Sequence, residues 1–147
     1  MPKLIVLLNE GLYKTVECEP EFELNFLNGI IGGWPECALQ VPSPSYLFES
    51  VNGTDWSLDL WCDEEGHLKR LPFTVNRPTD LHPLVGPIVI CNRREFWCDD
   101  GRDFRLRPFD DNTTKQIRDV LRERNWAEEV FNAGDVGSPE TDGGEAA

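Results

Sequence analysis

The sequence has few of the residues and motifs on which catalysis usually depends. Of 147 residues only two are histidine, His67 and His82, and there is no Gly-x-Ser-x-Gly turn, no phosphate-binding loop and no Gly-x-Gly-x-x-Gly fingerprint. Histidine is the usual acid–base group near neutral pH, and each missing motif carries a defined chemistry. We therefore expect no catalytic residue, no cofactor and no enzymatic activity.

Long apolar runs and basic residues are also scarce. No run approaches the roughly 20 apolar residues needed to span a bilayer, and the opening run at residues 4–8 ends at Asn9, too early for a secretory signal. The chain has 14 basic against 27 acidic residues, a net charge of -13. Such a charge excludes general binding to nucleic acids or anionic membranes. It leaves an enzyme, a small-molecule binder or an acidic mimic of nucleic acid.

The cysteines are odd in number and follow no metal-binding spacing. The five are Cys18, Cys37, Cys62, Cys91 and Cys98. Free thiols in a reducing cytoplasm explain them, and we expect a location in the host cytoplasm and no metal. The alternative is a zinc site that combines Cys91 and Cys98 with His67 or His82.

Hydrophobic patterning predicts strands separated by polar turns, and two helices. The strands are expected at residues 4–8, 12–18, 57–62, 84–91, 96–98 and 104–107, with one more running to about Val41. Pro20 opens a short helix that Asn28-Gly29 ends, and Asp111 or Asn112 caps a second helix from Thr113 to about Phe131.

These elements predict an α+β fold. A bent antiparallel β-sheet with one short helix forms a domain over residues 1–107, with an insertion at about 42–56. A C-terminal helix occupies 108–131. An acidic tail at 132–147 is expected to be disordered, since it has no base and little apolar content.

The charge is unevenly distributed along the chain. Residues 1–68 hold 12 acids and 2 bases, and residues 108–147 hold 10 acids and 4 bases. The segment 69–107 holds 8 bases, seven of them arginine, against 5 acids. Arginine forms forked hydrogen bonds to phosphate or carboxylate. This segment therefore either binds a small anion or pairs with neighbouring acids on the surface, which is the simpler interpretation.

Four short runs resemble a known family. Residues 30–34, 58–66, 71–77 and 84–90 carry, in order, a Gly-Gly pair after a helix, a strand ending in a Glu-Gly turn, a stretch with Asn-Arg, and a Val-Gly strand. Over about residues 2–91 the chain resembles the small phage-encoded domain family that includes the second type of Thoeris anti-defence protein. Those proteins bind cyclic ADP-ribose-type immune signals without cleaving them, and some relatives take up cyclic dinucleotides.

The resemblance implies a sponge that sequesters a small anionic cyclic nucleotide. The ligand-binding residues would be Gly32, Gly33, Trp34, Phe73, Asn76 and Arg77. Gly32 and Gly33 would expose backbone N–H groups, and Trp34 would stack on a base. Asn76 would read a base or ribose edge, and Arg77 would bind pyrophosphate. Otherwise Trp34 is a core aromatic, and Asn76-Arg77 is a turn with a surface ion pair.

The implied partners are the ligand and further copies of the chain. A deep pocket in so small a domain forms most easily between subunits, so we expect a homo-oligomer, a dimer or tetramer. The alternative function is an acidic interaction protein that inhibits a host defence protein directly, with DNA mimicry as one route. An enzyme that cleaves the signal ranks third.

Overall fold

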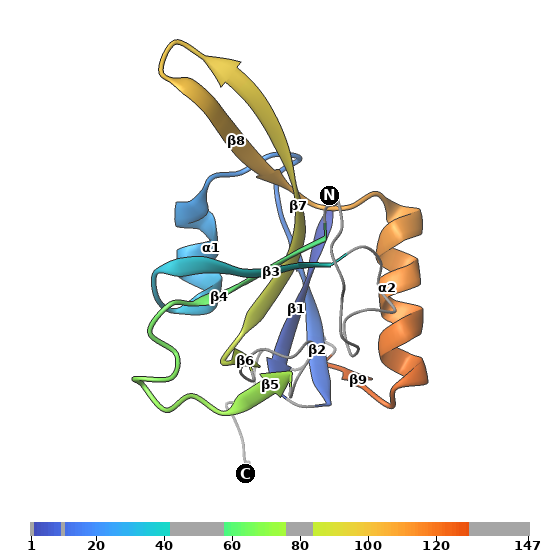
Figure 1. Ribbon diagram of the computed structural model, residues 1–147. Helices are drawn as coiled ribbons and strands as arrows, with labels where there is room; N and C mark the ends of the chain where they lie inside the picture. Colours follow the sequence, from blue (N-terminus) through green and yellow to red (C-terminus); the bar gives the residue numbers. More distant parts are fainter. Residues whose placement is uncertain (1, 10, 42–57, 76–83, 130–147) are drawn as a thin grey trace, which may run out of the picture.

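A mixed β-sheet lies between two helices in the computed structural model, which describes residues 2–9, 11–41, 58–75 and 84–129 (Figure 1). Within these residues the main sheet has the strand order β3-β4-β7-β1-β2-β9, and β8 pairs with β7 beside it. Its strands are β1 (Lys3–Asn9), β2 (Leu12–Glu17), β3 (Pro35–Val41), β4 (Leu58–Asp63), β7 (Ile88–Cys98), β8 (Gly101–Arg107) and β9 (Ala127–Glu128). A second, small sheet pairs β5 (Phe73–Val75) with β6 (Leu84–Val85). The helices are α1 (Leu24–Ile31) and α2 (Asp111–Glu123), so the α+β expectation is confirmed.

The central strand β1 is buried on both faces, as its uninterrupted apolar run predicts. Leu4 and Val6 face the α1 side of the sheet, and Ile5 and Leu7 face the α2 side. All four side chains are at most 2% exposed, and burying each contributes about 1.5–3 kcal/mol. The expected hairpin with β2 is present, and Gly11 in its turn has a φ of +94°.

The helices cover opposite faces of the sheet with separate apolar clusters. Leu27 and Ile31 of α1 pack on one face, and Ile117 and Leu121 of α2 pack on the other. The sheet is mixed rather than purely antiparallel, because β9 runs parallel to β2 after the chain returns from α2.

Both helices differ from their predicted bounds. The first begins at Leu24 and continues past Gly29 to Ile31, where Gly32 caps it in the left-handed conformation. The second is capped by Asp110, whose carboxylate accepts a hydrogen bond from the Thr113 N–H, rather than by Asp111 or Asn112. It ends at Glu123, well before Phe131.

The strand β7 is longer than its apolar run. It continues past Cys91 through a polar stretch and forms, with β8, the hairpin expected around residues 99–101. This hairpin projects beyond the main sheet (Figure 1). We call residues 92–107 the arm.

Other predictions fall on residues that the structure does not describe. The 42–56 insertion, His82 and the 132–147 tail lie outside the described residues. No helix within the described ranges is long and apolar enough to cross a membrane.

Candidate functional site

The glycine pair and Trp34 form a rigid corner between α1 and β3. The Gly32 N–H donates to the Asn28 carbonyl at 2.8 Å, so this amide serves the helix cap and is not free for a ligand. The Trp34 carbonyl accepts from the Glu64 N–H at 3.0 Å. The side chain of Trp34 is 66% exposed, which excludes the core-aromatic interpretation. We call Gly32, Gly33 and Trp34 the glycine-pair corner.

Asp63 holds this corner against the chain that follows β4. Its side chain is almost fully buried and packs on Gly33, where a Cβ would lie only 2.6 Å from the Asp63 Cγ. It accepts hydrogen bonds from Lys69 Nζ at 2.7 Å and from the Glu65 N–H at 2.9 Å. The bond from Lys69 lowers the pKa of Asp63 despite the opposing effect of burial, and the Glu65 N–H adds to the shift. A half-exposed ammonium is thereby held beside the corner.

The turn after β4 connects the corner to the small β5–β6 sheet. Gly66 lies against this sheet, since a Cβ there would be 2.8 Å from a methyl group of Val85. Thr74 donates its hydroxyl hydrogen bond to the Gly86 carbonyl, and the Gly86 N–H donates to the Pro72 carbonyl at 2.9 Å. Contacts thus run without a break from Trp34 to the paired ends of β5 and β6.

Three of the predicted binding residues are placed only in part or not at all. Phe73 pairs through its backbone with Val85, but its side chain lies outside the description. Asn76 and Arg77 lie outside the described residues, in the segment 76–83 that joins β5 to β6. The structure therefore places Gly33 and Trp34 together, and it does not place Asn76 and Arg77.

Four arginines of the basic segment pair with acids, as the simpler interpretation holds. Arg93 bonds Asp59 at 2.7 Å, and Arg105 lies 3.8 Å from Glu23. The other two pairs are Arg94–Glu21 and Arg102–Glu95.

Arg93 is part of the protein interior. Its guanidinium lies 4.9 Å from the ring centre of Phe104 and 5.7 Å from that of Trp61. Burial lowers the pKa of Arg93, but the hydrogen bond and the charge of the fully buried Asp59, with a smaller contribution from Cys37, together raise it. Breaking such a pair leaves an uncompensated buried charge, so Arg93 stabilises the fold.

The buried cysteines carry protonated thiols. Burial raises the pKa of Cys18 and of Cys62 to about 11, and it raises that of Cys91 further above its ordinary value. A thiol is nucleophilic and binds metal as the thiolate. Cys91 is buried and Cys98 is exposed on the arm. No cluster of metal-binding side chains occurs within the described residues.

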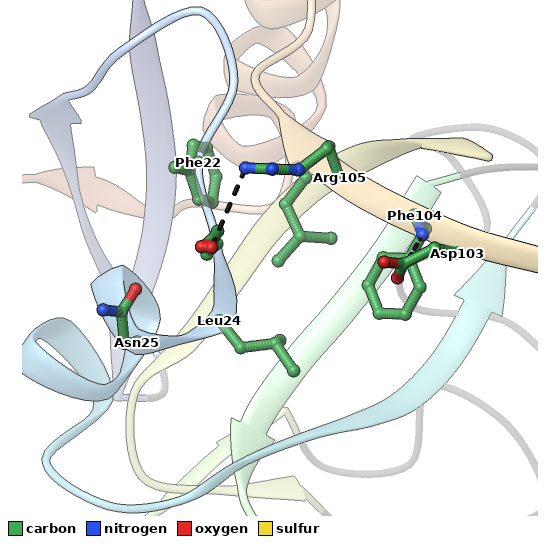
Figure 2. Close-up of a pocket in the computed structure, with 8 residues that line it drawn as sticks. Phe22, Leu24, Asn25, Asp103, Phe104 and Arg105 are labelled. Atoms are coloured by element: carbon green, nitrogen blue, oxygen red, sulfur yellow. Dashed lines mark hydrogen bonds and ion pairs between the residues drawn. The ribbon is translucent and has the colours of Figure 1, made fainter. Parts of the chain in front are cut away.

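A second feature, which the sequence did not predict, is a pocket of about 380 Å³ beside the base of the arm. One wall is the chain that enters α1 and the other is β8 (Figure 2). The two segments are joined where Phe22 and Leu106 exchange backbone hydrogen bonds. Its lining residues are Phe22, Glu23, Leu24, Asn25, Asp103, Phe104, Arg105 and Leu106.

This pocket is separate from the glycine-pair corner and differs from it in charge. The two lie at opposite ends of α1, whose eight residues span about 12 Å. Two carboxylates and one guanidinium line the pocket, so it does not favour an anion. In the sequence, the alternation of Phe104 and Leu106 with charged residues is the one pattern that indicates this pocket. No family model, no curated protein and no solved structure matches this chain.

Proposed function

We propose that the protein is a phage anti-defence protein that binds a small anionic cyclic nucleotide in the host cytoplasm and sequesters it without cleavage. The candidate ligands are cyclic ADP-ribose isomers and cyclic dinucleotides. The observation that carries the proposal is the exposed indole of Trp34, mounted on a backbone that is hydrogen-bonded on both sides.

The surroundings of Trp34 suit such a ligand. Base–aromatic stacking contributes about 1–3 kcal/mol per base, and the exposed indole is open to a ligand. Lys69 lies beside the corner, where its ammonium pairs with Asp63. Asn76 and Arg77 follow β5 in the sequence and lie outside the described residues.

Binding without cleavage is supported by the state of the three buried thiols. Burial raises the pKa values of Cys18, Cys62 and Cys91, so these groups are neither accessible nor ionised at neutral pH. Sequestration needs only affinity, which stacking and charge supply.

Isothermal titration calorimetry with cyclic ADP-ribose isomers and cyclic dinucleotides tests the proposal. Trp34→Ala is expected to weaken binding by about tenfold or more, the loss that one stacked base predicts. Lys69→Ala should weaken it less, and Lys115→Ala, which removes an exposed cation from α2 instead, is the matched control.

Two further results would contradict the proposal. One is the absence of binding to every ligand of this panel by the wild-type protein. The other is recovery of a cleaved ligand after heat denaturation of the complex. Capture of one dominant host protein, unaffected by Arg77→Ala, would favour the direct inhibitor. Direct inhibition by mimicry is less well supported, because four of the acids are already paired with arginine or lysine within the chain. These acids are Glu21, Glu23, Asp59 and Asp63.

A further inference from the structure

The base of the arm is held by contacts of Arg93, Phe104 and Leu106 with the rest of the chain, whereas its tip carries the exposed Trp97. Its strands pair from Asn92↔Arg107 to Cys98↔Gly101, and Phe22 bridges to Leu106 at the base. Among the described residues, no other strand pairs with residues 94–105. An isolated two-stranded hairpin is marginally stable in water. The arm therefore gains stability from any surface that packs on it.

The end of the arm carries a large exposed aromatic side chain. Trp97 is 78% exposed, and the guanidinium of Arg102, directly opposite on β8, lies 5.8 Å from the centre of its ring. The pair presents a flat apolar surface, one indole N–H donor and a guanidinium that also pairs with Glu95. Tryptophan and arginine are the residues most often found as anchors of protein interfaces.

The pocket at the base of the arm complements this pair. Phe22, Leu24 and Phe104 supply apolar walls, as Figure 2 shows. Two carboxylates also line the pocket: that of Glu23 is paired with Arg105, and that of Asp103 can accept a hydrogen bond from an indole N–H and attract a guanidinium. The same carboxylates repel a nucleotide phosphate, so the pocket suits the tip of an arm better than it suits the proposed ligand.

We propose that two copies of the chain associate through their arms, each placing Trp97 and Arg102 in the pocket of the other. The arm strand from residue 92 to 98 is about 20 Å long at 3.3 Å per residue. Two such arms lying antiparallel bring each tip beside the other base, which gives a closed two-fold contact. The proposal does not depend on nucleotide binding.

Charge also favours the arm as the place where two copies meet. Residues 92–107 hold five arginines and four acids, whereas the whole chain has a net charge of -13. Two such chains repel one another over most of their surfaces. Along the arm, where bases and acids nearly balance, the repulsion between two copies is weaker than the net charge of the chain implies.

Sedimentation equilibrium tests the association. The wild-type protein is expected to dimerise, and Trp97→Ala to raise the dimer dissociation constant by about tenfold or more, as for an interface anchor. Trp34→Ala is the matched control, because it removes another strongly exposed indole from the far end of α1. Circular dichroism establishes that each variant remains folded. A monomeric wild-type protein, or a dimer that Trp97→Ala leaves unchanged, would overturn the proposal.

Cross-linking provides a second test that leaves Trp97 in place. Cys98 is exposed next to Trp97, and Asn25 lines the pocket. Asn25→Cys is expected to form a cross-linked dimer with a short bismaleimide, and adding Cys98→Ser is expected to abolish it. Lys115→Cys, at an exposed site on α2, is the control. Equal cross-linking of Asn25→Cys and Lys115→Cys would count against the arm contact.

Discussion

At the scale of single residues, the two adjacent glycines have different roles. Gly32 has a φ of +82°, and a Cβ there would meet nothing within 4 Å, so its requirement is conformational. At Gly33 the requirement is for space, because a Cβ would collide with the buried carboxylate of Asp63. The sequence showed that the backbone bends or approaches something here. The partner of Gly33 was not predictable, because Asp63 is 30 residues away and looks like part of a solvated acidic turn.

Gly33→Ala is expected to destabilise the protein by about 1–3 kcal/mol, the usual cost of forcing extra atoms into a packed site. The added methyl group must push the Asp63 carboxylate away from Lys69 and the Glu65 N–H. Gly29→Ala is the control, since Gly29 lies within α1 with nothing near its Cβ position. That change should stabilise the protein by about 0.5–1 kcal/mol. Urea denaturation measures both, and equal stabilities for the two variants would show that the contact with Asp63 is unimportant.

At the scale of elements, strands with continuous apolar runs were predictable and element ends were not. The polar stretch after Cys91 predicted that the strand ends there. In the structure, Arg93 pairs with Asp59 and contacts two aromatic rings, and β7 therefore continues into the arm. Burial of Ile31 explains why α1 continues past Gly29. Asn125 adopts a positive φ after α2, and Trp126 then packs into the core, which ends the helix early. These causes are contacts between distant segments, which local patterns do not contain.

The start of α2 offers a direct test of which acid caps it. Asp110→Ala is expected to cost about 1 kcal/mol, because it leaves the Thr113 N–H without the carboxylate that it bonds at 2.7 Å. Asp111→Ala, one residue later, removes only a favourable charge near the helix N-terminus, worth a few tenths of a kcal/mol at this exposed position. Comparison of the two in urea denaturation checks the assignment. A larger loss of stability for Asp111→Ala than for Asp110→Ala would instead support Asp111 as the helix cap, as the sequence predicts.

At the scale of the whole molecule, the net charge of -13 opposes both proposed associations, and salt acts on them to different extents. Screening lengths fall from about 30 Å at 0.01 M salt to about 10 Å at 0.1 M. Salt therefore suppresses repulsion between two acidic bodies and strengthens a contact anchored by Trp97. For an anionic nucleotide, salt suppresses repulsion from the acidic chain but also weakens the local attraction to Lys69, so the two effects oppose each other.

Sedimentation and calorimetry over this range of sodium chloride check both responses. The dimer dissociation constant should fall as salt rises, whereas the nucleotide dissociation constant should change less. Trp97→Ala separates them, because it removes the first response and leaves the calorimetric measurement on a monomer. A dimer that dissociates as salt rises would mean that charge pairs such as Arg102 with the pocket carboxylates, rather than the apolar burial of the indole, provide most of the binding energy.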